Sequence, residues 1–259
     1  MKIPCYYVDA FAGEAFHGNP AAICPLESWL PDRIMQNIAA ENNLSETAFF
    51  VPRGEDFDLR WFTPTTEVDL CGHATLASAF VLFAERGFPR YLVNFHTRSG
   101  VLSVTRQSDL YMLDFPARPP VACVPPQNLT DGLGAKPVEV LKSRDYLAVF
   151  ASEREVRALT PDFAALKTLD CLGIIATAPG RQCDFVSRFF APAAGVNEDP
   201  VTGSAHCTLI PYWAKRLKKT NLSACQVSAR GGELSCELRD ERVKIGGRAR
   251  IFMRGEISL

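Results

Sequence analysis

The sequence has no long apolar run and no excess of charge of either sign. Of its 259 residues, 28 are Lys or Arg and 29 are Asp or Glu, so the formal net charge is −1. A balanced charge gives no electrostatic reason to bind nucleic acid or an anionic membrane. No apolar run approaches the roughly 20 residues of a membrane-spanning helix, and Pro4 and Asp9 interrupt any signal-peptide core. We therefore expect a cytoplasmic protein that binds neither nucleic acid nor membrane.

The sequence also lacks the cysteine and histidine patterns of disulfide frameworks and metal centres. Its nine cysteines are an odd number, and no two of them form a Cys-X-X-Cys pair. The four histidines are far apart and fit no metal-ligand spacing. We predict no metal site, and we expect most of the cysteines to be reduced, buried and apolar in character.

The chain does contain one internal repeat. Residues 44–64 and 172–192 both begin as a short apolar strand, pass through a turn with Pro, Gly and Arg, and continue as an aromatic strand. The ends of the two copies, RWFTP and RFFAP, lie 128 residues apart. In each copy an acidic loop, a Gly and an apolar helical stretch follow. We interpret this order as a duplicated domain, although chance likeness among strand-loop-helix units is the alternative.

The two helical stretches, residues 74–86 and 205–217, are apolar nearly all round and should be buried. Most other segments have strand patterns. The sequence predicts an α+β fold of two pseudo-symmetric domains, each a rolled, mainly antiparallel sheet around a central apolar helix. The expected domains are residues 1–117, completed by the C-terminal strand at about 250–259, and residues 118–249. Further expected features are helices at 32–42 and 161–169 and a proline-rich inter-domain connection at 116–137.

Gly72 and Gly203 precede the two helical stretches at equivalent places of the repeat. A helix N-terminus offers free backbone N–H groups and a partial positive charge, which suit a carboxylate or an oxyanion. Glycine lets a ligand approach that backbone closely. We predict that the two helix starts line one binding cleft. The alternative is that both glycines serve only tight turns.

Glu46 is the candidate general base. It stands at the start of a short apolar strand, where partial burial would make a carboxylate more basic. The second copy of the repeat places Ile174 at the corresponding position. One base rather than two symmetric bases is therefore expected. A surface glutamate on an edge strand is the alternative.

Five more side chains stand near the two helix starts. His73 could donate to a substrate oxygen or pack against its helix, and Cys71 lies where a thiolate is stabilised. Asp199 could bind a substrate amino group, orient His73 or cap its helix. Ser204 could cap the helix or bind substrate. His206 is expected to be structural.

Several of these residues fall within motifs that resemble one family. The motifs are DAF at 9–11, FHGNPAA at 16–22, LSETAF at 44–49, CGHAT at 71–75 and EDPVTGSAH at 198–206. In this order and spacing they resemble the PhzF family of phenazine-biosynthesis-like isomerases, from residue 6 to at least residue 217. The family is similar in fold to diaminopimelate epimerase, with an active site between its two domains.

The resemblance implies a role for each site residue. Glu46 would be the catalytic acid and base, with His73 and Asp199 beside it. The expected substrate-binding residues are Gly72, Gly203, Ser204, Asn19 and Cys71. The resemblance also implies that no cofactor is needed, that the protein is a homodimer, and that its partner is a small carboxylate-bearing metabolite.

The chain departs from the epimerase pattern at one position. Diaminopimelate epimerase has a cysteine at both helix starts, whereas this chain has Cys71 at the first and Thr202 at the second. The hypothesis is therefore a proton shift on one face of the substrate, carried by Glu46. Two alternatives stay open: an amino-acid racemase or epimerase that uses Cys71 and Glu46 on opposite faces, and a catalytically silent small-molecule-binding or interaction protein.

Overall fold

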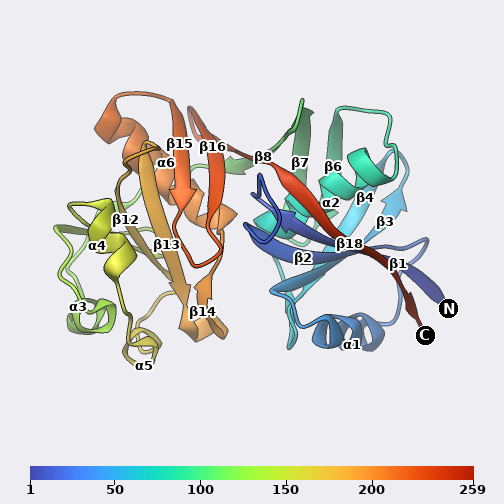
Figure 1. Cartoon of the computed structure of the whole chain (residues 1–259), viewed down its shortest axis with the longest axis horizontal. Coiled ribbons are helices and arrows are strands. Elements are labelled where there is room, and N and C mark those ends of the chain that lie inside the picture. Colours follow the sequence, from blue (N-terminus) through green and yellow to red (C-terminus); the bar gives the residue numbers. More distant parts are fainter. The chain divides into compact units, whose positions relative to one another are not determined.

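A computed structural model describes the whole chain, residues 1–259. The chain divides into two compact units (Figure 1). The first unit consists of Met1–Asp114 and Gly246–Leu259, and the second of Phe115–Ile245. These boundaries lie near the expected ones at residues 117 and 250. No helix in the structure combines the length and the apolar character needed to cross a membrane.

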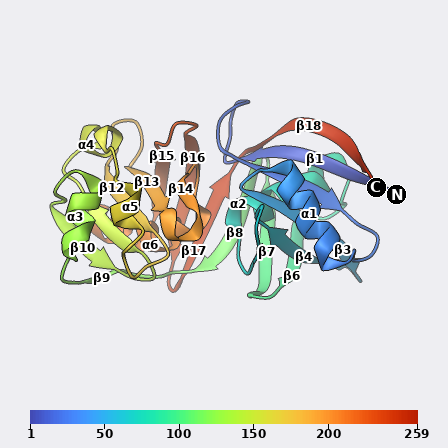
Figure 2. The same cartoon turned by 90° about the horizontal axis from the view of Figure 1, so that it is seen from below.

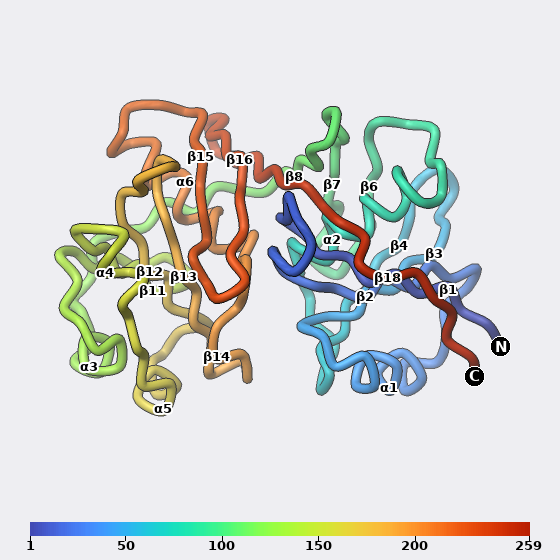
Figure 3. Tube along the Cα trace, viewed as in Figure 1, coloured from blue at the N-terminus to red at the C-terminus, as the bar shows by residue number.

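The strands of the first unit form one continuous sheet. Its spatial order is β18 (Ala249–Ser258), β1 (Lys2–Ala10), β2 (Asn19–Pro25), β3 (Glu46–Arg53), β4 (Asp56–Phe62), β6 (Leu92–Thr97), β7 (Gly100–Gln107) and β8 (Leu110–Pro116). The pairs β2–β3 and β4–β6 are parallel, and the other neighbours are antiparallel. The short β5 (Glu67–Val68) pairs with β4. Figure 3 shows the two chain termini side by side, where the Met1 amino group donates to the Leu259 carbonyl oxygen.

The central helix of this unit is α2 (Gly72–Phe80), and all of its residues are buried. It continues into a π-helical turn, Val81–Glu85, so the expected helix at 74–86 is present but begins two residues earlier. The second helix, α1 (Asp32–Asn42), forms where the sequence predicts it and packs on β3 and β4 (Figure 2). It ends at Asn43, which adopts the left-handed conformation that asparagine tolerates.

The second unit repeats the same order of pairings. Its sheet runs through β10 (Glu139–Lys142), β11 (Tyr146–Val149), β12 (Ile174–Pro179), β13 (Phe185–Ala191), β15 (Asn221–Gln226) and β16 (Gly232–Arg239), and β17 (Arg242–Gly247) follows along the chain. Here β11–β12 and β13–β15 are parallel, as β2–β3 and β4–β6 are in the first unit. The short β14 (Val196–Asp199) pairs with β13 as β5 pairs with β4.

The central helix of the second unit is α6 (Gly203–Leu217). Its smaller elements are β9 (Val121–Ala122), α3 (Gln127–Leu133), α4 (Glu153–Ala158), α5 (Phe163–Leu166) and the 3-10 turn Pro192–Ala194. Two expectations were wrong here. Residues 116–137 are not a plain connection, because they form β9 and α3, and Leu129 and Leu133 are fully buried in the core. The helix expected at 161–169 is shorter.

An ion pair also repeats between the two units. The guanidinium of Arg60 donates two hydrogen bonds to the carboxylate of Glu67, at 2.7 and 2.8 Å. Arg188 makes the same pair of bonds with Glu198, at 2.8 and 2.9 Å. Each guanidinium also lies over a phenylalanine ring two residues further along its own strand. Because the same contacts occur at corresponding residues, the two units share one architecture.

Candidate active site

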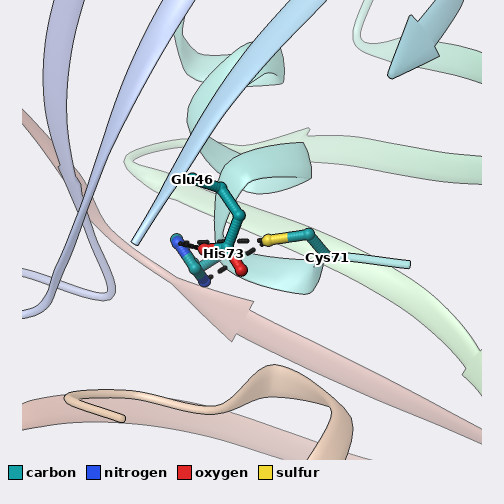
Figure 4. A group of neighbouring side chains, drawn as sticks. All are labelled: Glu46, Cys71 and His73. Atoms are coloured by element: carbon teal, nitrogen blue, oxygen red, sulfur yellow. Dashed lines mark hydrogen bonds and ion pairs between the residues drawn. The ribbon is translucent and has the colours of Figure 1, made fainter. Parts of the chain in front are cut away.

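Four side chains meet where β2, β3 and α2 begin. Glu46 begins β3, Asn19 begins β2, and Cys71 and His73 lie on either side of Gly72 at the start of α2. Glu46 Oε2 lies 3.0 Å from His73 Nε2, and Cys71 Sγ lies 3.5 Å from His73 Nδ1 (Figure 4). The side-chain nitrogen of Asn19 lies 3.2 Å from the same Nδ1. The imidazole thus has polar neighbours at both nitrogens.

The pair formed by Glu46 and His73 is largely shielded from water. The His73 side chain is 6% exposed and that of Glu46 is 18% exposed. The two atoms lie at ion-pair distance but are not aligned as a hydrogen bond, so the attraction between them is chiefly electrostatic. Glu46 Oε2 is therefore close to a positive charge while it accepts no well-aligned hydrogen bond from the protein.

The pKa values of this cluster are strongly shifted. Burial disfavours the charged imidazolium, but the interactions of His73 with Cys71 and Glu46 outweigh it and raise the pKa of His73 well above 6.5. Burial, together with the Glu46 carboxylate, raises the pKa of the Cys71 thiol to about 11. At neutral pH the thiol is therefore uncharged. Burial and the Glu46 carboxylate thus outweigh the stabilisation that a helix start gives to a thiolate.

The N-terminus of α2 carries no side-chain cap. Its N-cap residue is Cys71, whose side chain makes no cap hydrogen bond, and the residues of the first turn are buried. Thr75 turns inward and donates to the Cys71 carbonyl oxygen at 2.5 Å. The start of α6, after Thr202, has no side-chain cap either. Each central helix thus begins with the uncapped backbone that an anion can bind.

A glutamine fixes the loop before α6 in the second unit. Gln226 accepts a hydrogen bond from the Thr202 N–H at 2.8 Å and donates to the Asp199 carbonyl oxygen at 2.8 Å. The Thr202 hydroxyl donates to Asp199 Oδ2 at 2.5 Å. Sequence reasoning missed Gln226, because nothing in the chain marks a strand residue so far from the loop it holds.

The other predicted residues of the second unit divide into two kinds. Gly203 begins α6, and Ser204 follows it and is half-buried. His206 is fully buried, lies 2.9 Å from the Thr202 carbonyl oxygen, and has a pKa that burial lowers to about 4. His206 is therefore a neutral structural residue, as expected. Glu46, Asn19, Cys71, Gly72 and His73 come together in the first unit.

The strand register corrects the residue that matches Glu46 in the repeat. Arg60 pairs with Phe49, and its counterpart Arg188 pairs with Ala176. The turn of the second hairpin is one residue longer than that of the first. The sequence separation between corresponding residues of the two copies therefore differs before and after the turn. The ladder position that corresponds to Glu46 is consequently Gly173, not Ile174.

Gly173 leaves no room for a side chain. A Cβ atom placed there would lie 2.2 Å from Cζ of Phe189, a buried ring on the neighbouring strand. The second unit therefore has no carboxylate at the position that corresponds to Glu46. The residue at that position is Gly173 and not Ile174. In the second unit an aromatic ring fills the space of the acid.

The same cluster brings together three metal-ligating atom types. One donor atom each from Glu46, Cys71 and His73 lie within 4.8 Å of one another. The histidine spacing that predicted no metal site could not reveal this set, because Glu46 comes from a strand start that is distant in sequence. These donor types are ones that bind divalent cations, and a carboxylate beside an imidazole is also suited to acid–base chemistry.

Known proteins are similar to this chain over its whole length. A family model described as phenazine biosynthesis-like protein, PhzC-PhzF, matches residues 8–255. An uncharacterized isomerase of Pseudomonas aeruginosa is 55% identical over 259 residues, which cover 100% of both chains. The crystal structure of a PhzF-family protein of Enterococcus faecalis is 53% identical, with full coverage of both chains and a TM-score of 0.98.

A more distant likeness concerns the fold alone. A probable proline racemase of Agrobacterium radiobacter has a TM-score of 0.68 at 11% identity, covering 99% of this chain and 93% of that one. The α+β, epimerase-like fold predicted from the sequence is confirmed.

Proposed function

Because this chain belongs to the PhzC-PhzF family of phenazine biosynthesis-like proteins and is an isomerase, we propose that it moves a proton on a small carboxylate-bearing metabolite, with Glu46 as acid and base. The observation that carries the proposal is the 3.0 Å contact between Glu46 Oε2 and His73 Nε2 beside the uncapped start of α2. That contact puts a base, a positive charge and an anion-binding helix start in one place.

The proposed reaction begins with transfer of a C–H proton to the Glu46 carboxylate. The electron pair left behind spreads into an adjacent unsaturated or carboxyl group of the substrate. The His73 imidazolium and the first-turn N–H groups of α2 stabilise the developing negative charge. Protonated Glu46 then returns the proton to another carbon on the same face. Atoms and charge balance without a cofactor, so the proposal includes none.

The second unit supplies further candidate substrate ligands. Asp199 is held by the Thr202 hydroxyl and by Gln226, while Ser204 stands in the first turn of α6 next to Gly203. We propose that these groups bind a small-molecule ligand and take no part in the proton transfer. Ser204→Ala should then raise KM more than it lowers kcat.

Deuterium exchange tests the role of Glu46 and does not require an identified substrate. The protein is incubated in D₂O with a library of small unsaturated carboxylates, and mass spectrometry records which compounds gain deuterium or change their double-bond position. Wild-type protein should convert at least one compound, and Glu46→Gln should lower the rate by about 10²-fold or more. Glu41→Gln is the matched control, because Glu41 is exposed on α1.

Two results would contradict the proposal. The first is turnover by Glu46→Gln at the wild-type rate on the compound that the screen identifies. The second is a product that carries neither solvent deuterium nor an internally transferred hydrogen. A far-UV circular dichroism spectrum and a melting curve for each variant show that a loss of rate is not a loss of fold.

We propose in addition that two copies associate through β18. Phe252 is 56% exposed and Met253 is 40% exposed on this strand, and the Phe252 ring lies 5.9 Å from that of Phe16, which is also exposed. Exposed strands of this kind pair with other chains. Light scattering should show a dimer for the wild type and a monomer for Phe252→Glu. The control is Val124→Glu, at an 89% exposed valine of the second unit.

A further inference from the structure

We propose that Glu46, Cys71 and His73 together form a Zn²⁺ site, and that the bound ion blocks the proton transfer. The second part rests on the proposed function, whereas the first part stands by itself. The three donor atoms lie within 4.8 Å of one another, at the start of β3 and at the start of α2.

The donor types and separations fit zinc. Zinc binds thiolate sulfur at about 2.3 Å and imidazole nitrogen or carboxylate oxygen at about 2.0–2.2 Å, so its ligand atoms lie roughly 3–4 Å apart. In this cluster Glu46 Oε2 lies 3.0 Å from His73 Nε2, Cys71 Sγ lies 4.0 Å from the same nitrogen, and all three donor atoms lie within 4.8 Å, so small side-chain rotations would bring them to zinc distances. Three protein ligands leave the fourth tetrahedral position open, as in catalytic zinc sites.

Asn19 supports the metal-binding orientation of the imidazole. With Nε2 on the metal, Nδ1 carries the remaining proton and needs an acceptor. The Asn19 amide lies 3.2 Å from Nδ1, and its oxygen and nitrogen can exchange places by rotation about χ2. The oxygen would then accept from Nδ1–H. Metal-binding histidines commonly have such a partner on the second nitrogen.

Charge and protons balance in the metal complex. The Cys71 thiol loses its proton to solvent and becomes a thiolate, and His73 binds as a neutral imidazole after releasing its own proton. Two anionic ligands then neutralise the 2+ ion, with no oxidation or reduction. Zinc bound to Oε2 withdraws the negative charge that makes the Glu46 carboxylate a base, so the loaded protein is inactive in the proposed reaction.

Spectroscopy with Co²⁺ as the probe tests the site without a substrate. Co²⁺ added to the purified full-length protein should give tetrahedral d–d bands and a thiolate-to-cobalt charge-transfer band, and Zn²⁺ should displace it at one equivalent. Cys71→Ser should abolish the charge-transfer band and weaken Zn²⁺ binding by at least about tenfold. Cys207→Ser, at a buried cysteine of the second unit, should change neither.

The outcomes separate the two parts of the proposal. An octahedral Co²⁺ spectrum, or a charge-transfer band that survives in Cys71→Ser, would overturn the metal site. If the site is confirmed but one equivalent of Zn²⁺ leaves the deuterium-exchange rate of the wild type unchanged, the inhibition is overturned. Failure of the isomerase proposal appears differently, as unchanged exchange in Glu46→Gln, and leaves the Co²⁺ result intact.

Discussion

Glu46 Oε2 and His73 Nε2 lie 3.0 Å apart, although the two residues belong to different elements of the first unit. The contact places a carboxylate beside a buried imidazole, in a place with little water. Burial disfavours the imidazolium, but Cys71 and Glu46 together raise the pKa of His73 above its ordinary value. The pair therefore stores one mobile proton beside the helix start that would bind the substrate.

The stability of the fold should depend on pH through this pair. His73 has a folded-state pKa raised above its unfolded value of 6.5, so its contribution is complete below that value and is lost as pH rises toward the folded pKa. We expect the difference in unfolding free energy between wild type and Glu46→Gln to shrink as pH rises from 6 to 8.5. The upper limit of the slope for one proton is about 1.4 kcal/mol per pH unit.

Urea denaturation at a series of pH values measures this difference. Glu41→Gln should give a curve parallel to that of the wild type, since Glu41 is exposed on α1. A constant difference between wild type and Glu46→Gln across the range would show that the carboxylate does not hold the proton on His73.

Cys71 should react slowly with alkylating reagents. Its pKa is raised to about 11 by burial and by the Glu46 carboxylate, and only the thiolate is nucleophilic. We expect iodoacetamide labelling of Cys71, followed by peptide mass spectrometry, to be slower at pH 7 than that of the partly exposed Cys123, and to accelerate up to about pH 10. Rapid labelling at pH 7 that a substrate blocks would favour the racemase alternative instead.

The buried helices and the strand pattern could be predicted from the sequence because the spacing of apolar residues indicates them. The apolar surface of residues 74–83 has no polar side, so the helix had to lie within the sheet, and all residues of α2 are buried. The resemblance likewise identified Glu46 and His73 as site residues, and the structure brings them to contact distance.

Other features depend on geometry that a sequence does not encode locally. Glu46 corresponds to Gly173 because the second hairpin has one extra turn residue. A comparison of the two copies at one fixed sequence separation therefore misaligns a whole strand by one residue. The metal-ligating set joins a strand start to a helix start, and Gln226 reaches its loop across strand neighbours. Residues 116–137 contain prolines that are typical of a connection, and this pattern gives no sign that Leu129 and Leu133 are buried in the core.

Gly173→Ala should destabilise the second unit. The added methyl group would lie 2.2 Å from Cζ of Phe189, so the buried ring would have to shift within a packed core. Overpacking of this kind typically costs about 1–3 kcal/mol. Gly13→Ala is the matched control, because nothing lies within 4 Å of a Cβ at that position. In a double-mutant cycle, Phe189→Leu should recover part of the loss, and strictly additive effects would contradict the clash.

Gln226→Leu should be among the most damaging changes outside the apolar core. The substitution removes the acceptor of the Thr202 N–H and the donor to the Asp199 carbonyl oxygen, and both lie in the loop that begins α6. Buried groups left without partners cost about 1–3 kcal/mol each, so we expect a loss of about 2–4 kcal/mol in urea denaturation. The exposed Gln107, changed to leucine in the same way, should lose less than about 0.5 kcal/mol. A Gln226→Leu protein as stable as this control would mean that the loop is held without the glutamine. The orientation of Asp199 and Ser204 would then need another cause.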